Sequence, residues 1–217
     1  ITAKYNNGFN VIKSEAFKKH SKLIYEQSGI KLLFENGRNY ALYNEKEYEF
    51  PLLGLYQKKN LELVLSAVNY LKETGYKIYE CDIEKGLKTV KWGARLEYIP
   101  DKNIIIDGAH NPDAALELKK SLDYYFKNQK RIFIYSTLNT KDYKKISEIL
   151  FNKNDEIYFF EFNHKNAVSF NEYKKIVPNI KPFNKEKLNE ILDKDGLKII
   201  TGSLYMIGEL YVKLCTK

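Results

Sequence analysis

The segment from Ile104 to Leu122 constrains the fold of this chain more than any other part of the sequence. It opens with three consecutive isoleucines, a β-branched run typical of a buried strand. It closes with apolar residues that recur at helical spacing, namely Ala114, Leu118 and Leu122. The hexapeptide Asp107-Gly108-Ala109-His110-Asn111-Pro112 therefore connects the end of a strand to the start of a helix. In open α/β sheets this edge is where ligands bind.

The hexapeptide region contains residues with a local structural role and residues without one. Asn111 is a favourable helix N-cap, Pro112 suits the first helical turn, and Asp113 complements the helix dipole. These roles leave Asp107 and His110 unexplained, and we expect both at the rim of the sheet, available to a ligand. Two structural alternatives stay open: Asp107 can cap the turn, and His110 can serve only the local structure.

From Arg95 onward the pattern alternates between strands and helices. Strands are expected at residues 96–99, 104–106, 131–135, 156–162 and 197–201. Helices are expected after Pro112 and at residues 142–150, 169–177, 185–192 and 204–214. Such alternation predicts an α/β fold with a mostly parallel sheet and helices on both faces.

The N-terminal part of the chain has a different pattern. We expect a short strand at residues 9–13, a helix from Glu15 to about Gln27, and antiparallel strands at 30–35, 40–43 and 47–50. Asn36-Gly37 is a strong turn signal between two of these strands. A long helix is expected from about Lys58 to Thr74. Residues 82–93 then form the expected boundary region between two units.

The composition narrows the functional classes. The net charge of +8 is compatible with nucleic acid or with anionic small molecules as partners. Since the lysines are dispersed and there are only three arginines, we expect small anionic substrates and no nucleic acid. The sequence contains no run of about 18 apolar residues, which is the length that a membrane-spanning helix needs. Two distant cysteines indicate neither a disulfide framework nor a zinc site, so we expect a cytoplasmic protein.

Four segments, taken together and in order, resemble one family. They are Gly54-Leu55-Tyr56-Gln57 with Asn60, Trp92-Gly93-Ala94-Arg95-Leu96-Glu97, the hexapeptide, and Gly202-Ser203-Leu204-Tyr205 with Ile207-Gly208-Glu209. This set resembles the folylpolyglutamate synthase/dihydrofolate synthase family of the Mur ligase superfamily, from about residue 50 to residue 217. The hexapeptide is shared across the superfamily, whereas the Arg-Leu-Glu and Gly-Ser-Leu-Tyr elements favour the folate branch.

The resemblance implies a domain organisation. It implies an enzyme with an ATPase domain followed by a Rossmann-like C-terminal domain. Residues 1–85 are expected to be the tail of the ATPase domain, and residues 86–217 the whole C-terminal domain. No glycine-rich phosphate loop is found in the sequence, and the chain starts at Ile1 rather than Met. We therefore expect a fragment of a longer, monomeric enzyme, with the Mg²⁺ ligands mainly outside it and no activity by itself.

The resemblance also implies a reaction, in which ATP and Mg²⁺ support the joining of L-glutamate to dihydropteroate or to a (poly)glutamyl folate. The substrate carboxylate takes the γ-phosphoryl group of ATP, and the glutamate amine attacks the resulting acyl phosphate. Both steps develop negative charge on oxygen, so the site needs cations and oriented donors.

Five residues take roles from the resemblance, although none is assigned as a catalytic residue or as a metal ligand. Asn60, Arg95 and Asp107 are expected to bind ATP, and His110 and Ser203 to bind glutamate. Arg95 has the alternative of a surface arginine at a strand start. Asn60 and Ser203 each have the alternative of a plain helix N-cap.

The sequence departs from the family pattern at two places. Gly93-Ala94 replaces the proline-glycine pair before the arginine, and Tyr56 replaces a histidine before Gln57. The first departure bears on the placement of Arg95.

Two alternative functions stay open. One alternative function is a stand-alone nucleotide-binding or interaction module without catalysis. The other is a different amino-acid ligase of the Mur type.

Overall fold

The computed structural model describes residues 1–2, 8–25, 29–35 and 38–215. The chain divides into two compact units, Ile1–Lys91 and Trp92–Lys217. The boundary expected between residues 85 and 86 falls inside helix α3 (Glu80–Thr89). This helix belongs to the first unit because its Leu87 is buried in one hydrophobic cluster with Tyr48. The division therefore follows helix α3 instead of cutting it.

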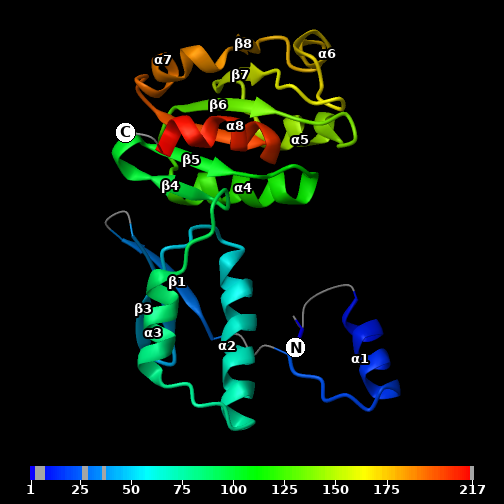
Figure 1. Cartoon of the computed structure of the whole chain (residues 1–217), viewed down its shortest axis with the longest axis vertical. Helices are drawn as coiled ribbons and strands as arrows, with labels where there is room; N and C mark the ends of the chain where they lie inside the picture. Colours follow the sequence, from blue (N-terminus) through cyan, green and yellow to red (C-terminus); the bar gives the residue numbers. More distant parts are fainter. Residues whose placement is uncertain (3–7, 26–28, 36–37, 216–217) are drawn as a thin grey trace. The chain divides into compact units, whose positions relative to one another are not determined.

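The first unit contains a small antiparallel sheet and, among its described residues, three helices (Figure 1). The sheet has the order β1-β2-β3, with strands at Lys31–Glu35, Arg38–Tyr43 and Lys46–Glu49. The helices are α1 (Phe9–Lys18), α2 (Gln57–Glu73) and α3. The three strands and the long helix expected from the sequence are confirmed. The turn expected at Asn36-Gly37 lies outside the described residues.

The expected strand at residues 9–13 is wrong, because these residues form the start of helix α1. None of the residues in α1 is buried, and a helix pairs its own backbone groups without a neighbouring strand. The helix ends at Lys18 and not near Gln27. It ends there because His20 adopts a left-handed φ of 50°, which is incompatible with continuation of an α-helix.

The second unit is built on a six-stranded sheet of order β4-β5-β9-β6-β7-β8. The strands are Glu97–Ile99, Ile104–Asp107, Leu197–Gly202, Arg131–Ser136, Glu156–Phe160 and Lys181–Phe183 in that order. Strand β4 is antiparallel to β5, and all other pairs are parallel. The mostly parallel sheet is thus confirmed. Strand β8 was not expected, because it is short and contains Pro182, which sheets tolerate at their edges.

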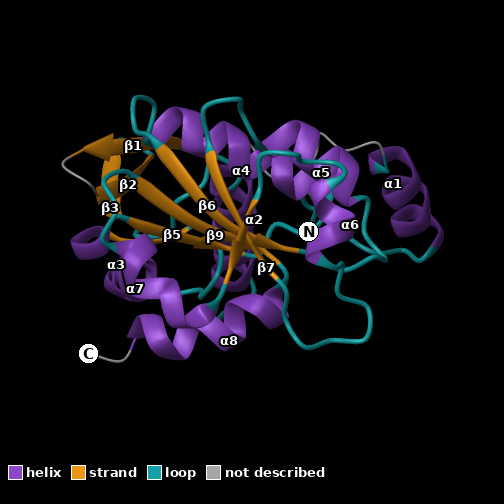
Figure 2. Cartoon of the chain, turned by 90° about the horizontal axis from the view of Figure 1, so that it is seen from above, coloured by secondary structure: helices purple, strands orange, loops and turns teal. Residues whose placement is uncertain are grey.

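Helices cover both faces of this sheet, as expected (Figure 2). Helices α4 (Pro112–Tyr125) and α5 (Tyr143–Leu150) lie on one face. Helices α7 (Leu188–Leu192) and α8 (Leu204–Cys215) lie on the other, and the short α6 (Phe170–Lys174) follows β7 in the chain. Two 3-10 turns, Pro100–Lys102 and Lys185–Lys187, precede β5 and α7. No helix in the described ranges combines the length and apolar character of a membrane crossing.

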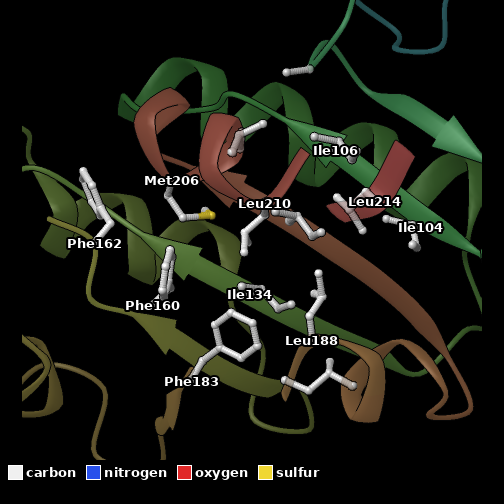
Figure 3. Close-up of a cluster of buried hydrophobic side chains, with 14 of the residues drawn as sticks. Ile104, Ile106, Ile134, Phe160, Phe162, Phe183, Leu188, Met206, Leu210 and Leu214 are labelled. Atoms are coloured by element: carbon white, nitrogen blue, oxygen red, sulfur yellow. The ribbon is translucent and has the colours of Figure 1, made fainter. Parts of the chain in front are cut away.

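The core of the second unit explains why the parallel strands have continuous apolar runs. Ile104, Ile106 and Ile134 face α8, where Met206 and Leu210 complete one buried cluster (Figure 3). The alternating neighbours on the same strands are equally buried on the opposite face, as with Ile105, Phe133 and Ile199. Burial on both faces holds strands β5, β9 and β6 in the centre of the unit.

Candidate functional site

Three loops meet at the carboxyl edge of the second sheet. Strands β5, β9 and β6 are neighbours, and their last residues pair as Asp107 with Thr201 and Ser136 with Gly202. The hexapeptide turn, the start of α8 and the loop at residues 137–141 therefore leave the sheet side by side. This edge is the expected ligand-binding edge of an α/β sheet.

The carboxylate of Asp107 connects two segments of this edge. Its Oδ2 accepts a hydrogen bond from the backbone N–H of Leu96 at 2.8 Å, and its Oδ1 accepts one from the N–H of Ala109 at 2.8 Å. The side chain is 5% exposed. The turn-capping alternative left open by the sequence is therefore realised in the geometry, and this carboxylate fixes the segment around Arg95 against the hexapeptide.

Burial raises the pKa of Asp107 to about 6 from an ordinary 3.8, against the opposing effect of the Leu96 and Ala109 N–H groups. Between pH 4 and pH 6 the folded protein thus binds more protons at this site than the unfolded chain does. As the pH rises from 4 to 6, we therefore expect the free energy of unfolding to fall by about 2–3 kcal/mol relative to that of the non-titrating Asp107→Asn variant. Urea unfolding of both proteins at several pH values tests this. Parallel pH profiles would contradict it.

Arg95 lies in a loop whose backbone is held on both sides. The N–H of Ala94 donates to Glu97 Oε2 at 2.9 Å, and the Ala94 carbonyl accepts from the N–H of Gly108 at 2.9 Å. Ala94 and Leu96 adopt left-handed φ values of 54° and 45°. Alanine thus takes a left-handed conformation next to Arg95, although glycine adopts it at lower cost. The departure from proline-glycine therefore leaves a defined turn.

The guanidinium of Arg95 is half-buried and makes no hydrogen bond or ion pair within the described part of the chain. Its positive charge acts on the carboxylate of Asp107, where it favours the ionised form. A cation whose backbone is fixed and whose donors are unused is suited to bind an anionic group, and guanidinium geometry matches phosphate oxygens.

The ring of His110 is oriented by its own turn. Nδ1 lies 2.8 Å from the carbonyl oxygen of Gly108. Because a carbonyl only accepts hydrogen bonds, Nδ1 carries the hydrogen. In the neutral ring Nε2 is then an acceptor, available to a ligand that donates a hydrogen bond.

Ser203 stands directly before α8. Its N–H donates to the carbonyl of Ser136 at 3.0 Å, and its carbonyl accepts from the N–H of Ile207 at 3.0 Å. Its side chain is 5% exposed, and its Oγ has no hydrogen-bond partner within the described residues. The hydroxyl does not cap the helix, so the alternative of a plain N-cap is not supported by the geometry.

A cavity of about 180 Å³ brings two predicted residues together. Its lining consists of His110, Thr137, Leu138, Lys141, Ser203, Leu204 and Tyr205. His110 and Ser203, both expected to bind glutamate, therefore share one pocket. Sequence reasoning missed Thr137 and Lys141. The available signal was their position in the loop that follows the strand expected at residues 131–135, since parallel strands end at one edge.

Asn60 belongs to the first unit. Helix α2 begins at Gln57, so Asn60 lies inside the first turn and the N-cap alternative is wrong. Its Nδ2 donates to Oε1 of the buried Gln57 at 2.8 Å, while Asn60 itself is exposed. Within the described residues, no group of three His, Cys, Asp or Glu side chains could hold a metal ion.

Comparisons with known proteins agree with the motifs. The family model for the dihydrofolate synthetase C-terminal domain matches residues 95–172. A probable dihydrofolate synthetase of Schizosaccharomyces pombe is 28% identical over 184 residues, which cover 76% of this chain and 44% of that protein. The chain thus spans about half the length of the curated relatives it matches.

Two solved structures share the fold. Mycobacterium tuberculosis folylpolyglutamate synthase complexed with ADP and AMPPCP has a TM-score of 0.78 at 20% identity, covering 96% of this chain and 53% of that one. The bifunctional folylpolyglutamate synthase/dihydrofolate synthase from Yersinia pestis, complexed with AMPPNP and a Mn ion, has a TM-score of 0.72 at 18% identity. It covers 95% of this chain and 51% of that one. The resemblance inferred from the four motifs is confirmed.

Proposed function

Because the chain corresponds to the C-terminal portion of the folylpolyglutamate synthase/dihydrofolate synthase family, we propose that it is part of an ATP-dependent ligase for glutamate. The enzyme joins L-glutamate to dihydropteroate or to a (poly)glutamyl folate. The observation that carries this proposal is the shared pocket of His110 and Ser203 at the carboxyl edge of the sheet, with Arg95 fixed nearby through Asp107.

The proposed reaction proceeds through an acyl phosphate. The substrate carboxylate attacks the γ-phosphorus of ATP, and ADP leaves. The glutamate amine then attacks the acyl carbon, so that the C–N bond forms as the C–O bond to phosphate breaks. Arg95 places its guanidinium against the phosphate oxygens, where negative charge develops in both steps. Its unused donors and its fixed backbone support this role.

Glutamate is proposed to bind in the pocket at the start of α8. The unpartnered Oγ of Ser203 and the free N–H groups of a helix N-terminus are suited to a carboxylate. Nε2 of His110 is suited to accept a hydrogen bond from the amine, because Nδ1 is engaged by Gly108. This pairing orients the amine lone pair toward the acyl carbon.

Asp107 and Asn60 remain proposed nucleotide contacts. Each carboxylate oxygen of Asp107 accepts one backbone hydrogen bond and retains capacity for a second. Asp107 thus has two proposed roles, since it also positions the loop of Arg95. The Mg²⁺ that accompanies ATP is proposed to take its ligands mainly from outside this chain.

The test is ADP release by the full-length protein, measured with each substrate omitted in turn. We expect ADP only when ATP, a pteroate or folate, and L-glutamate are all present, together with a product heavier by one glutamate. ADP release that requires a UDP-linked sugar peptide instead would assign another Mur-type ligase. Saturable ATP binding without turnover on any of these substrates would assign a binding module without catalysis.

A further inference from the structure

The loop that carries Arg95 has an unfavourable backbone conformation on both sides of the arginine. Ala94 and Leu96 adopt left-handed φ values of 54° and 45°. Residues other than glycine keep this conformation only where the surrounding contacts hold it. Asp107 holds the Leu96 side of the loop through its hydrogen bond to the Leu96 N–H. The contacts on the Ala94 side therefore also determine where Arg95 points.

The carboxylate of Glu97 connects the Ala94 side of this loop to helix α8. Its Oε2 accepts a hydrogen bond from the N–H of Ala94 at 2.9 Å, and its Oε1 accepts one from the hydroxyl of Tyr211 at 2.7 Å. A Cβ added at Gly93 would lie 3.7 Å from Glu97 Oε2 and 3.7 Å from the Tyr211 hydroxyl, so these groups converge beside the loop. Glu97 thus binds two different segments, one with each carboxylate oxygen.

Both ends of this connection are themselves fixed. Glu97 lies in strand β4, where it pairs with Ile106 of β5. Tyr211 lies in helix α8 and packs against the buried cluster that contains Ala94 and Leu210 (Figure 3). An acceptor held by a strand and a donor held by a helix lose little further conformational entropy when they meet. The connection is therefore rigid enough to orient the loop between them.

We infer that Glu97 and Tyr211 are positioning residues, which hold the loop of Arg95 against α8 and keep its guanidinium in the orientation that phosphate binding requires. This inference rests on the proposed function, because it assigns the groups that orient Arg95. The need for these groups follows from the alanine at position 94. Glycine would adopt the left-handed conformation at little cost, whereas Ala94 depends on the hydrogen bond that Glu97 accepts.

The first test removes each part of the connection in the full-length protein. Glu97→Ala should lower kcat/KM for ADP formation about 10- to 100-fold, the usual effect of losing a hydrogen bond to a charged group. Tyr211→Phe leaves the bond to Ala94 in place, so it should lower kcat/KM only about 3- to 10-fold. Glu97→Gln keeps an acceptor for the N–H of Ala94 and should retain most of the activity.

Two combined variants distinguish positioning from a general structural role. In the Arg95→Met background, Glu97→Ala should cause a further loss of about twofold or less, because the guanidinium that Glu97 orients is already absent. A loss that came only from destabilised folding would instead multiply with the loss caused by Arg95→Met. Adding Ala94→Gly to Glu97→Ala should recover about fivefold or more, because glycine adopts the left-handed φ without the hydrogen bond.

The matched control is Tyr158→Phe, which removes another tyrosine–glutamate hydrogen bond. The Tyr158 hydroxyl donates to Glu156 Oε1 at 2.6 Å on strand β7. This variant should leave kcat/KM within about twofold of the wild type.

The outcomes separate the inference from the proposed function. Full activity of Glu97→Ala, or a further tenfold loss when it is added to Arg95→Met, would overturn the inference while the ligase function stands. For a protein that binds ATP without ligase activity, the measurement is the Kd for ATP by calorimetry. A Kd raised by both Glu97→Ala and Arg95→Met, and restored to the first by Ala94→Gly, would support the inference and remove the proposed function. A Kd unchanged in both variants of such a protein would overturn both.

Discussion

Replacing Arg95 with methionine should lower kcat/KM for ADP formation about 100- to 1000-fold, which is the usual cost of removing one oriented donor from a charged transition state. Methionine retains the length of the side chain and removes its charge and its donors. The loop should keep its conformation, because it is held through backbone groups and through Asp107. Steady-state kinetics of the full-length protein provide the measurement.

Two further variants test the interpretation of that loss. Arg95→Lys retains the charge without the planar fork of donors, so it should recover only part of the activity. Arg38→Met makes the same chemical change at an exposed position of strand β2 and should leave kcat/KM within about twofold. If Arg95→Met retained a third or more of the wild-type kcat/KM, Arg95 would not contact the phosphates.

Replacing Gly202 with alanine should destabilise the second unit by about 2–5 kcal/mol. Gly202 ends strand β9 with a φ of 111°, and an added Cβ would lie 2.0 Å from the carbonyl oxygen of Ser136 and 2.9 Å from the ring of Tyr135. The strained φ costs about 1–2 kcal/mol, and forced repacking about 1–3 kcal/mol. Urea unfolding followed by circular dichroism provides the measurement.

The matched control for Gly202 is another glycine in the same unit. Gly208 lies in helix α8, where an added Cβ meets no atom within 4 Å. Gly208→Ala should therefore stabilise the unit by about 0.5–1 kcal/mol, since alanine favours a helix interior. Equal unfolding midpoints for Gly202→Ala and the wild type would show that the β6–β9 edge is not closely packed at this point. Because Ser203 follows Gly202, the destabilised variant should also weaken the glutamate binding that is proposed at Ser203.

The parts of the fold that could be predicted are those encoded by local periodicity. The isoleucine run at residues 104–106 and the helical spacing after Pro112 predict a strand and a helix, and both are confirmed. Strand β8 and helix α1 could not be predicted correctly. A three-residue edge strand contains too few side chains to produce a pattern, and α1 buries none of its residues. Strand β8 is determined by its pairing with β7. Helix α1 has no buried face that could leave a pattern in the sequence.

The candidate site also contains residues that could be predicted from the sequence and residues that could not. The hexapeptide, Arg95 and Ser203 could be identified because their residue types and order are informative within short segments. Lys141 could not be identified, because a lysine in a loop is common in a lysine-rich chain. Its significance comes from strands β5, β9 and β6 ending side by side, which brings three separate segments, from His110 to Tyr205, into one pocket.

The sequence by itself therefore determined the class of fold, the edge of the sheet at which ligand binding is proposed and the family that the motifs resemble. The tertiary structure alone decided what the hexapeptide does. It joined Asp107 to the backbone of Leu96, turned Nδ1 of His110 toward Gly108, and left the Oγ of Ser203 without a partner. The physical reason is that periodicity reports which face of an element is buried, whereas hydrogen-bond partners depend on which distant segments are neighbours in space.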